Sequence, residues 1–439
     1  MLRKKGQLFA FLMTTFLVFV GLAGCSEDKS TSSSTDNENV DGVTLSVLIG
    51  NTSSKAGVEA VAKLVEEKYN IKTEFEIRPS GAEGDNLMKT RLATGDMTDI
   101  AYYNSGSLMH ALNPSKNFVD LSDEPYADKL MDSFKESVSD QNGLYGIPGN
   151  PVQVGGWFYN KKLYEELGLE VPKTWTELME NNEKIKEAGK TPVIGTYKET
   201  WTSQLIVLAD NFNVLAENPD FPENYTANKA KIATTPGALK SFEKMQDIYE
   251  KGYMNEDFLS TTYDAGMKML AEGEGAHYPM LSQILPLMAE NYPDEIGDIG
   301  VFPQPGDNAE KNGFTIWMPN AYYINKNSEN IDAAKKWFEV FVSEEGVAAY
   351  LAADPPIGPF AIEDVKLPED VFTAVKDMTP YFEEDKTAPA LEFLSPLKGP
   401  NLEQILIEVG SGIKSAKEGA ELYDKDVEKQ AKQLNLEGW

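Results

Sequence analysis

The sequence predicts an α/β protein built as two lobes, because strand and helix patterns alternate near its start and the chain is too long for one core. Apolar residues alternate with others over residues 43–49, which indicates a strand. Residues 58–69 then carry apolar side chains at helical spacing, and residues 71–77 alternate again. A strand, a helix and a strand in close succession imply a parallel pair joined by a right-handed crossover.

A helix over residues 84–94 and a short strand over residues 99–103 continue this pattern. Ligands of open α/β sheets bind just beyond the carboxyl ends of the strands. We therefore expect the residues that follow these strands to lie near a cleft: Asn51, Thr52, Tyr103 and Asn104.

The 439 residues, with 41% hydrophobic and 10% aromatic content, suit a folded globular protein. Single cores stop growing at about 250–300 residues, so two lobes are expected. Glycines and prolines cluster between residues 143 and 156, as they would where the chain crosses from one lobe to the other.

Helix-start signals mark the middle of the chain. Thr174 is followed three residues later by Glu177, the spacing of a capping box. Thr235 precedes Pro236, a proline favoured at the first helical position. Helices are expected to dominate residues 160–290, and an apolar stripe predicts a core-facing helix near its Trp337.

The first 25 residues indicate export. Basic residues at positions 3–5 precede an apolar run over residues 8–20, which is too short for a membrane-spanning helix. Cys25, the single cysteine, directly follows Leu-Ala-Gly and so resembles the lipidated cysteine of bacterial lipoproteins. This predicts a signal peptide over residues 1–24 and a flexible tether over residues 25–42. Acyl chains of the palmitate kind on Cys25 would hold the protein at the extracytoplasmic face of the cell membrane.

The net charge of -30 makes nucleic-acid binding unfavourable, because the phosphate backbone is also negative. Only Arg78 and Arg91 would remain after the signal is removed, and arginine is the usual clamp for carboxylates and phosphates. The composition therefore favours a neutral or cationic ligand.

Common catalytic motifs are missing. The sequence has two histidines and no HExxH, CxxC, GxSxG, P-loop or GxGxxG pattern. We therefore expect no catalytic residue, metal site or cofactor, and a protein that is not an enzyme.

Several segments resemble the family 1 extracellular solute-binding proteins, in the branch that serves as sugar receptors of bacterial ABC importers. The resemblance covers essentially the whole chain after the signal. Its most specific part runs from Trp157 through Leu178, and its other parts lie at residues 91–100, 143–148, 299–303, 325–341 and 423–439.

This resemblance implies a periplasmic-binding-protein-like fold of type II, with two α/β lobes joined by hinge strands around a ligand cleft. Lobe 1 would comprise residues 43–149 and 299–346, and lobe 2 residues 150–298 and 347–439. It also implies a monomer that captures a neutral sugar or oligosaccharide and delivers it to the transmembrane subunits of an ABC permease.

The candidate ligand contacts are aromatic and hydrogen-bonding residues at strand ends and loops that match the family's cleft, since rings fit sugar faces and amides or carboxylates bind hydroxyls. The family's stacking tryptophan is absent after Gly275, where His277 or Tyr278 stands instead, so the identity of the sugar does not transfer. The candidates are Thr52, Tyr102, Tyr103, Asn104, Gln153, Trp157, Glu199, Trp201, His277 and Trp317.

Two other functions remain open from sequence. A surface glycoside hydrolase needs two carboxylates flanking the bond, and 70 acidic residues leave room for such a pair. A receptor for a non-sugar polar solute, such as a peptide, is the other alternative.

Overall fold

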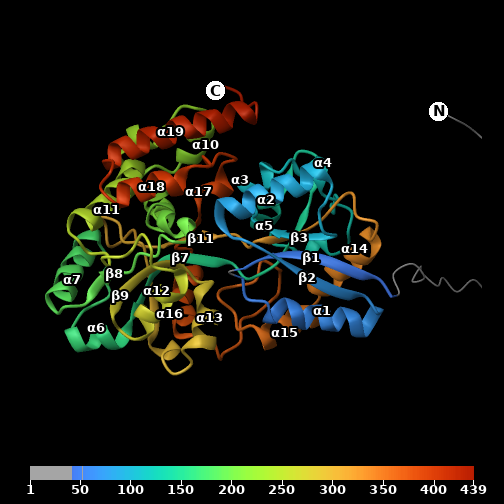
Figure 1. The fold of residues 1–439 in the computed structure, drawn as a ribbon, viewed down its shortest axis with the longest axis horizontal. Coiled ribbons are helices and arrows are strands. Elements are labelled where there is room, and N and C mark those ends of the chain that lie inside the picture. Colours follow the sequence, from blue (N-terminus) through green and yellow to red (C-terminus); the bar gives the residue numbers. More distant parts are fainter. Residues whose placement is uncertain (1–41, 52) are drawn as a thin grey trace, which may run out of the picture. The chain divides into compact units, whose positions relative to one another are not determined.

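The computed structural model describes residues 42–51 and 53–439. The predicted signal peptide, Cys25, the tether up to residue 41, and Thr52 lie outside the described residues. The described chain forms two large sheets, each with helices packed on it, and one small two-stranded sheet (Figure 1).

The first sheet has five strands in the order β2-β1-β3-β12-β6. β1 pairs in parallel with β2 and β3, whereas β12 is antiparallel to both β3 and β6. We call this sheet and its helices the first lobe. Its strands are β1 Thr44–Gly50, β2 Lys72–Arg78, β3 Ile100–Tyr103, β6 Gly146–Pro148 and β12 Ala321–Ile324, beside a small hairpin of β4 Ser139–Asp140 and β5 Gly143–Leu144.

The predicted strand–helix–strand unit is confirmed. β1 and β2 pair in register from Thr44 opposite Lys72 to Gly50 opposite Arg78, and α1 between them buries its apolar face. Figure 1 shows α1 and α15 on one side of the sheet and α2 on the other. The helices of the first lobe are α1 Ala56–Tyr69, α2 Gly81–Thr94, α3 Ser107–His110, α4 Pro114–Asn117, α5 Asp132–Ser137, α14 Ile331–Phe341 and α15 Glu344–Ala353.

The second sheet has six strands, in the order β13-β11-β7-β9-β8 with β10 also paired to β7. We call this sheet and its helices the second lobe. The long strand β7 is buried along its whole length. The strands are β7 Gln153–Asn160, β8 Thr191–Val193, β9 Gly275–Leu281, β10 Ile299–Pro303, β11 Phe314–Trp317 and β13 Thr387–Pro389.

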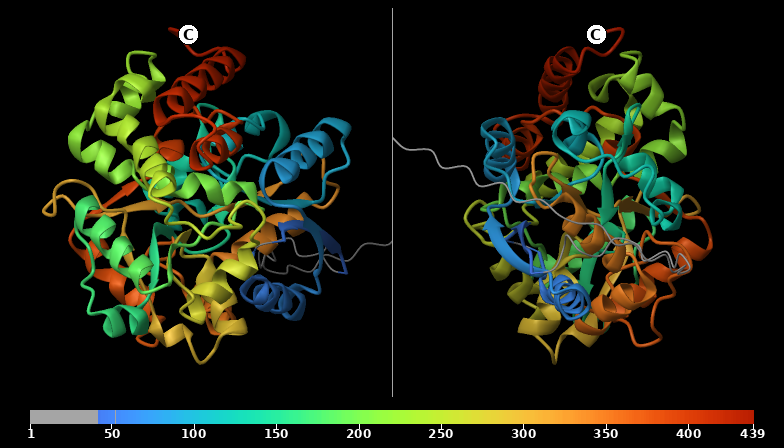
Figure 2. Two further views of the ribbon diagram at one scale, coloured as in Figure 1. Left: turned by 60° about the vertical axis from the view of Figure 1, so that its left-hand side comes forward. Right: turned by 90° about the vertical axis from the view of Figure 1, so that its right-hand side faces the viewer.

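Helices cover the second sheet, and both views in Figure 2 show the red C-terminal helices beside yellow-green α11. The capping box at Thr174 and Glu177 is present, with both reciprocal hydrogen bonds. These helices are α6 Lys161–Leu167, α7 Trp175–Glu187, α8 Leu205–Leu208, α9 Asn211–Glu217, α10 Phe221–Thr226, α11 Pro236–Glu250, α12 Tyr263–Ala271, α13 Ile284–Asn291, α16 Thr373–Glu383, α17 Leu391–Leu394, α18 Leu402–Gly410 and α19 Ala416–Gln433.

The strand β10 does not join the first sheet, to which the sequence assigned residues from 299 onward. It pairs antiparallel with β7 from Ile299 opposite Asn160 to Pro303 opposite Gly156, and β11 also pairs with β7. The chain reaches the first sheet only at β12. Strand patterning does not reveal the partner of a short apolar strand, since either sheet would bury it.

The chain passes between the lobes at residues 149–152, 318–320 and 354–372: the first two segments connect strands of different sheets, and the third connects α15 to α16. Backbone hydrogen bonds join these crossings. The Gly149 N–H donates to the Asn320 carbonyl at 2.8 Å, and the Val152 N–H donates to the Pro359 carbonyl at 2.7 Å. The crossings therefore form one connected hinge.

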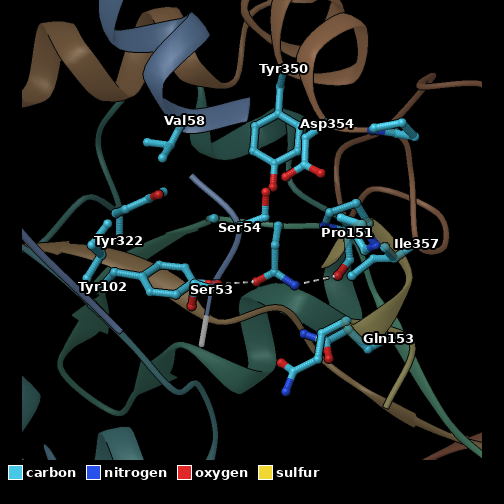
Figure 3. A pocket seen from close by; sticks show the side chains of 16 residues that line it. Ser53, Ser54, Val58, Tyr102, Pro151, Gln153, Tyr322, Tyr350, Asp354 and Ile357 are labelled. Atoms are coloured by element: carbon cyan, nitrogen blue, oxygen red, sulfur yellow. Dashed lines mark hydrogen bonds between the residues drawn. The ribbon is translucent and has the colours of Figure 1, made fainter. Parts of the chain in front are cut away.

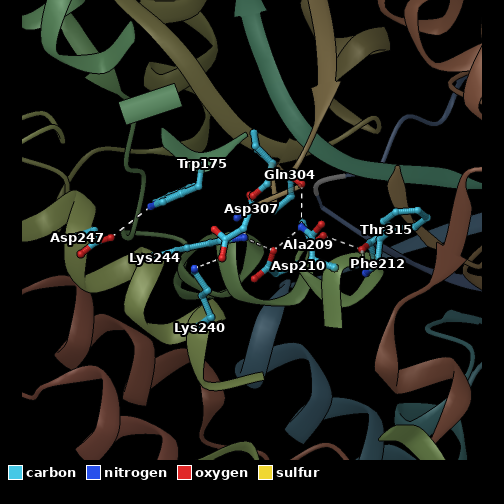
Figure 4. A network of polar contacts seen from close by, with 12 residues as sticks. Trp175, Ala209, Asp210, Phe212, Lys240, Lys244, Asp247, Gln304, Asp307 and Thr315 are labelled. Carbon is cyan, nitrogen blue, oxygen red and sulfur yellow. Dashed lines mark hydrogen bonds and ion pairs between the residues drawn. The ribbon is translucent and has the colours of Figure 1, made fainter. Parts of the chain in front are cut away.

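A buried ion pair lies within the second lobe (Figure 4). Lys244 of α11 contacts Asp210 at 2.5 Å, with their side chains 2% and 1% exposed. The Lys244 ammonium also donates to the Pro305 carbonyl at 2.8 Å and lies 5.3 Å from the centre of the Trp175 ring. The pair thus links α11 to the segment that precedes α9 and to the chain after β10.

Replacing Lys244 by methionine should lower the free energy of unfolding by about 3–5 kcal/mol, because Asp210 is left buried without its cation. Urea unfolding followed by circular dichroism measures this loss. The control is Lys240→Met: its partner Asp307 is 53% exposed, so the change should stay within about 1 kcal/mol. Equal losses in both variants would contradict the assignment of the buried pair as the stabilising one.

Candidate functional site

A cleft of about 670 Å³ lies between the lobes and is lined by residues of both. The first lobe contributes the carboxyl ends of β1 and β2, at Gly50 and Arg78, and the start of α2. The second lobe contributes the segment around Trp201 and residues 392–403. The carboxyl ends of these strands therefore border the cleft, which is where open α/β sheets bind their ligands.

The structure brings several of the predicted residues together at this cleft, from both lobes and the hinge. Tyr102 lies near the end of β3, Asn104 directly follows that strand, and Gln153 begins β7 just after the first crossing. Those that line the cleft are Tyr102, Asn104, Gln153, Trp201 and Trp317.

Hydrogen bonds fix two of the aromatic rings. The Tyr102 hydroxyl donates to Asn150 Oδ1 at 2.8 Å, and burial raises the pKa of Tyr102 to about 12. Trp317 Nε1 donates to Glu392 Oε1 at 2.9 Å. Glu392 Oε2 in turn accepts from Lys398 at 2.6 Å, so this carboxylate is held from two sides.

A smaller pocket of about 40 Å³ adjoins the cleft at the hinge and shares Tyr102 and Gln153 with it. Figure 3 shows Tyr350 and Asp354 close to Ser54 on its wall. Burial raises the pKa of Asp354, while hydrogen bonds from the Ser54 side chain and the Gly57 backbone oppose that rise. This volume is enough for ordered water and is far smaller than that of the cleft.

Some buried polar atoms without a hydrogen-bond partner belong to residues that line the cleft. Among the described residues that line it, Gln153, Gln204 and Arg78 are 4%, 7% and 6% exposed. Gln153 Oε1 and Gln204 Oε1 have no donor, and Arg78 Nε and Trp201 Nε1 have no acceptor. Since an unpaired buried polar group costs about 1–3 kcal/mol, these atoms call for a ligand or water.

The charge of the lining is balanced, in contrast to the net charge of -30 for the chain. The described lining holds equal numbers of basic and acidic side chains, and Lys398 and Glu392 form an ion pair. These charged residues are Arg78, Lys89, Lys398, Asp85, Glu392 and Glu403.

Two predicted residues lie in the core of the second lobe rather than at the cleft. His277 on β9 is fully buried: its Nδ1 donates to the Pro192 carbonyl at 2.9 Å, and its Nε2 accepts from the Tyr164 hydroxyl at 2.6 Å. Trp157 packs edge-on against this ring and donates to Gln304 Oε1 at 2.5 Å. Both side chains point from the sheet into packed helices.

Tyr103 and Glu199 also lie outside the residues that line the cleft. Alternation along β3 turns Tyr103 away from the face of Tyr102, and its hydroxyl donates to Asp85 Oδ1 at 2.8 Å. Glu199 Oε2 accepts from the Tyr263 backbone N–H at 2.7 Å, so this carboxylate positions the start of α12.

Sequence reasoning missed Arg78, Gln204 and Glu392. The rarity of arginine was the available signal for Arg78, which ends β2 at the sheet edge and lies 5.3 Å from the centre of the Tyr103 ring. Gln204 and Glu392 carry no such signal, because they lie in short helical segments whose place depends on packing.

Within residues 42–51 and 53–439, no helix is long and apolar enough to cross a membrane, and no cluster of three potential metal ligands occurs.

The chain belongs to the bacterial extracellular solute-binding protein family, whose model matches residues 50–348. It is 23% identical to the multiple sugar-binding protein of Streptococcus mutans serotype c over 376 residues, which are 83% of this chain and 84% of the relative.

Solved structures share the two-lobed fold. A chitin oligosaccharide binding protein has a TM-score of 0.76 at 20% identity, over 89% of this chain and 100% of its own. The solute-binding protein RafE in complex with raffinose has a TM-score of 0.72 at 20% identity, over 89% and 99% of the two chains.

The buried place of His277 predicts a pH dependence of stability. Desolvation lowers the pKa of His277 from 6.5 to about 3. Between these pH values the imidazole is protonated in the unfolded state and neutral in the folded state. Stability is therefore lost as the pH falls below about 6.5, by about 1.4 kcal/mol per unit from this group. Urea unfolding of wild type and His277→Gln at pH 4.5, 5.5 and 7.5 measures the difference in slope. If the free energy of unfolding changed with pH equally in wild type and His277→Gln, the predicted contribution of His277 would be contradicted.

Proposed function

We propose that the cleft binds a neutral sugar or oligosaccharide, and that the protein is the substrate-binding receptor of a bacterial ABC importer. The observation that carries this proposal is the set of buried, unpartnered polar atoms on Gln153, Gln204 and Trp201 at the cleft. Sugar hydroxyls both donate and accept, so one polyol satisfies the amide oxygens and the indole N–H together.

The aromatic rings and the charge balance support a neutral carbohydrate. Trp201, Trp317 and Tyr102 line the cleft and offer apolar faces to the C–H faces of a sugar. Equal numbers of basic and acidic side chains in the lining give no net preference for an ion. The ligands named for the similar proteins, raffinose and chitin oligosaccharides, are also carbohydrates.

Receptor function without chemistry is favoured over hydrolysis because the carboxylates at the cleft are already engaged. Asp85 accepts from Tyr103, Glu392 accepts from Trp317 and Lys398, and Glu403 accepts from Thr200. Burial raises the pKa of Glu403, a feature that general acids share. A test for sugar turnover must therefore accompany the test for sugar binding.

A receptor for peptides is the remaining alternative. Titration with a panel of peptides distinguishes it from a sugar receptor.

The proposal extends to location and partners. The lipoprotein-like segment that ends at Cys25 supports a lipid anchor on the extracytoplasmic face of the membrane, after removal of residues 1–24. From there a monomer would deliver its ligand to the transmembrane subunits of a permease.

Isothermal titration calorimetry with mono- and oligosaccharides, and chromatography of the recovered ligand, test the receptor function. Wild type should bind at least one sugar and return it intact. Gln153→Ala should weaken binding about 5- to 150-fold, since one buried hydrogen bond is worth about 1–3 kcal/mol. The control Gln141→Ala, at an exposed glutamine away from the cleft lining, should bind as wild type does.

Conversion of a sugar by wild type would contradict the receptor proposal in favour of a hydrolase. Binding of peptides and no sugar would favour the alternative receptor.

Substituting Cys25 by alanine should release the protein from the membrane, because the acceptor for the lipid is lost. Cell fractionation and immunoblotting compare this variant with Ser26→Ala, which keeps the cysteine. Membrane retention of Cys25→Ala would contradict the lipid anchor.

A further inference from the structure

Trp317 is the last residue of β11 and one of the aromatic residues that line the cleft, and its indole is held at both ends. At one end, Trp317 Nε1 donates to Glu392 Oε1 at 2.9 Å. At the other end, its six-membered ring packs against Gly155 of the neighbouring strand β7, where an added Cβ would lie 2.3 Å from Trp317 Cζ3. The two contacts together fix where the ring lies at the cleft.

The acceptor of the indole N–H is itself held in place. Glu392 belongs to α17, and the Ala390 N–H just before this helix donates at 2.9 Å to the carbonyl of Ile316, the neighbour of Trp317 in β11. Glu392 Oε2 accepts from the Lys398 ammonium at 2.6 Å, and the two side chains are 6% and 13% exposed. All of these contacts lie within the second lobe, so they do not depend on the distance between the lobes.

Stability alone does not account for a buried ion pair at this point. Removing a carboxylate and an ammonium from water costs free energy, and proteins in which apolar side chains replace such a pair are often as stable or more stable. A hydrogen bond to a charged acceptor is, however, shorter and stronger than one to a neutral acceptor. The pair of Glu392 and Lys398 therefore gives the Trp317 indole a firmer anchor than packing alone.

We propose that Glu392, neutralised by Lys398, is a positioning residue for ligand binding: it holds the Trp317 ring in the orientation that packs against the C–H face of a bound sugar. This proposal rests on the receptor function proposed above. A ring that is already oriented loses little rotational freedom when the sugar binds, so the sugar is bound more tightly. Glu392 thus raises the affinity through Trp317, with no contact of its own to the sugar.

Two paired variants of the full chain test this role, because they differ in the acceptor alone. The amide variant, Glu392→Gln with Lys398→Met, removes both charges and keeps an oxygen for the indole N–H. The apolar variant, Glu392→Leu with Lys398→Met, removes that oxygen as well. In calorimetry with the sugar that wild type binds most tightly, the amide variant should bind nearly as wild type does. The apolar variant should bind about 3- to 10-fold more weakly, the cost of ordering one side chain.

A double-mutant cycle shows whether this loss passes through the ring. In the Trp317→Phe background, which has no indole N–H, the amide and apolar variants should bind the sugar equally. NMR spectra give a second readout that needs no ligand. The indole N–H signal of Trp317, identified by its absence in Trp317→Phe, should lie further upfield in the apolar variant than in the amide variant. The control Glu408→Gln, in a partly exposed ion pair away from the cleft lining, should bind as wild type does.

Gly155→Ala perturbs the other end of the ring and replaces the apolar variant if that protein does not fold. The three atoms nearest to the new methyl group all belong to the Trp317 ring. This substitution should therefore weaken sugar binding, and weaken it less in the Trp317→Phe background. An equal loss in both backgrounds would contradict a role for the orientation of the ring.

Equal affinities of the amide and apolar variants would overturn the proposal. A difference between them that persists in the Trp317→Phe background would overturn it too, and so would the same indole N–H signal in both. In these cases sugar binding by wild type leaves the receptor function standing. If wild type binds no sugar, the receptor function is contradicted and the role of Glu392 falls with it.

Discussion

The hinge is the constraint on which the cleft depends. The chain passes between the lobes at residues 149–152, 318–320 and 354–372, and hydrogen bonds from Gly149 to Asn320 and from Val152 to Pro359 join these crossings. Two sheets are thereby held along one edge, and one apolar core continues from the first sheet onto one face of the second. Small rotations of the backbone at these crossings would change the width of the cleft.

Buried polar atoms without a partner occur both at the cleft and in the cores, where the two side-chain amide atoms of Asn182 are examples. In the second lobe, Lys244 and Asp210 neutralise each other, and both ring nitrogens of His277 have partners. At the cleft, Gln153 Oε1 and Gln204 Oε1 are buried without a donor. Protein interiors seldom tolerate such groups, and those at the cleft adjoin a space of about 670 Å³, which supports a polar ligand there. This arrangement would discriminate between sugars, because a sugar that leaves one of these protein atoms unpaired binds more weakly by the desolvation free energy of that atom.

Local patterns in the sequence predicted local structure well and tertiary partners less well. Alternation over residues 43–49 and 71–77 predicted β1 and β2, and the spacing of Thr174 and Glu177 predicted the capping box, because these features depend on neighbouring residues alone. Tyr102, Gln153 and Trp317 were placed near the cleft from strand ends and family resemblance. His277 was not distinguished from a ligand contact, since its burial depends on Tyr164 and Pro192, far away in sequence. Contacts between residues far apart in sequence also decide that β10 pairs with β7 and that Glu392 binds Trp317, so the sequence assigned β10 to the other lobe and gave no sign of Glu392.

A crystal structure of the protein with a bound sugar tests the central claim most directly. Ligand hydroxyls should lie within about 2.5–3.2 Å of Gln153 Oε1, Gln204 Oε1 and Trp201 Nε1. A sugar bound away from the cleft, or one in the cleft that leaves these three atoms unpaired, would contradict it.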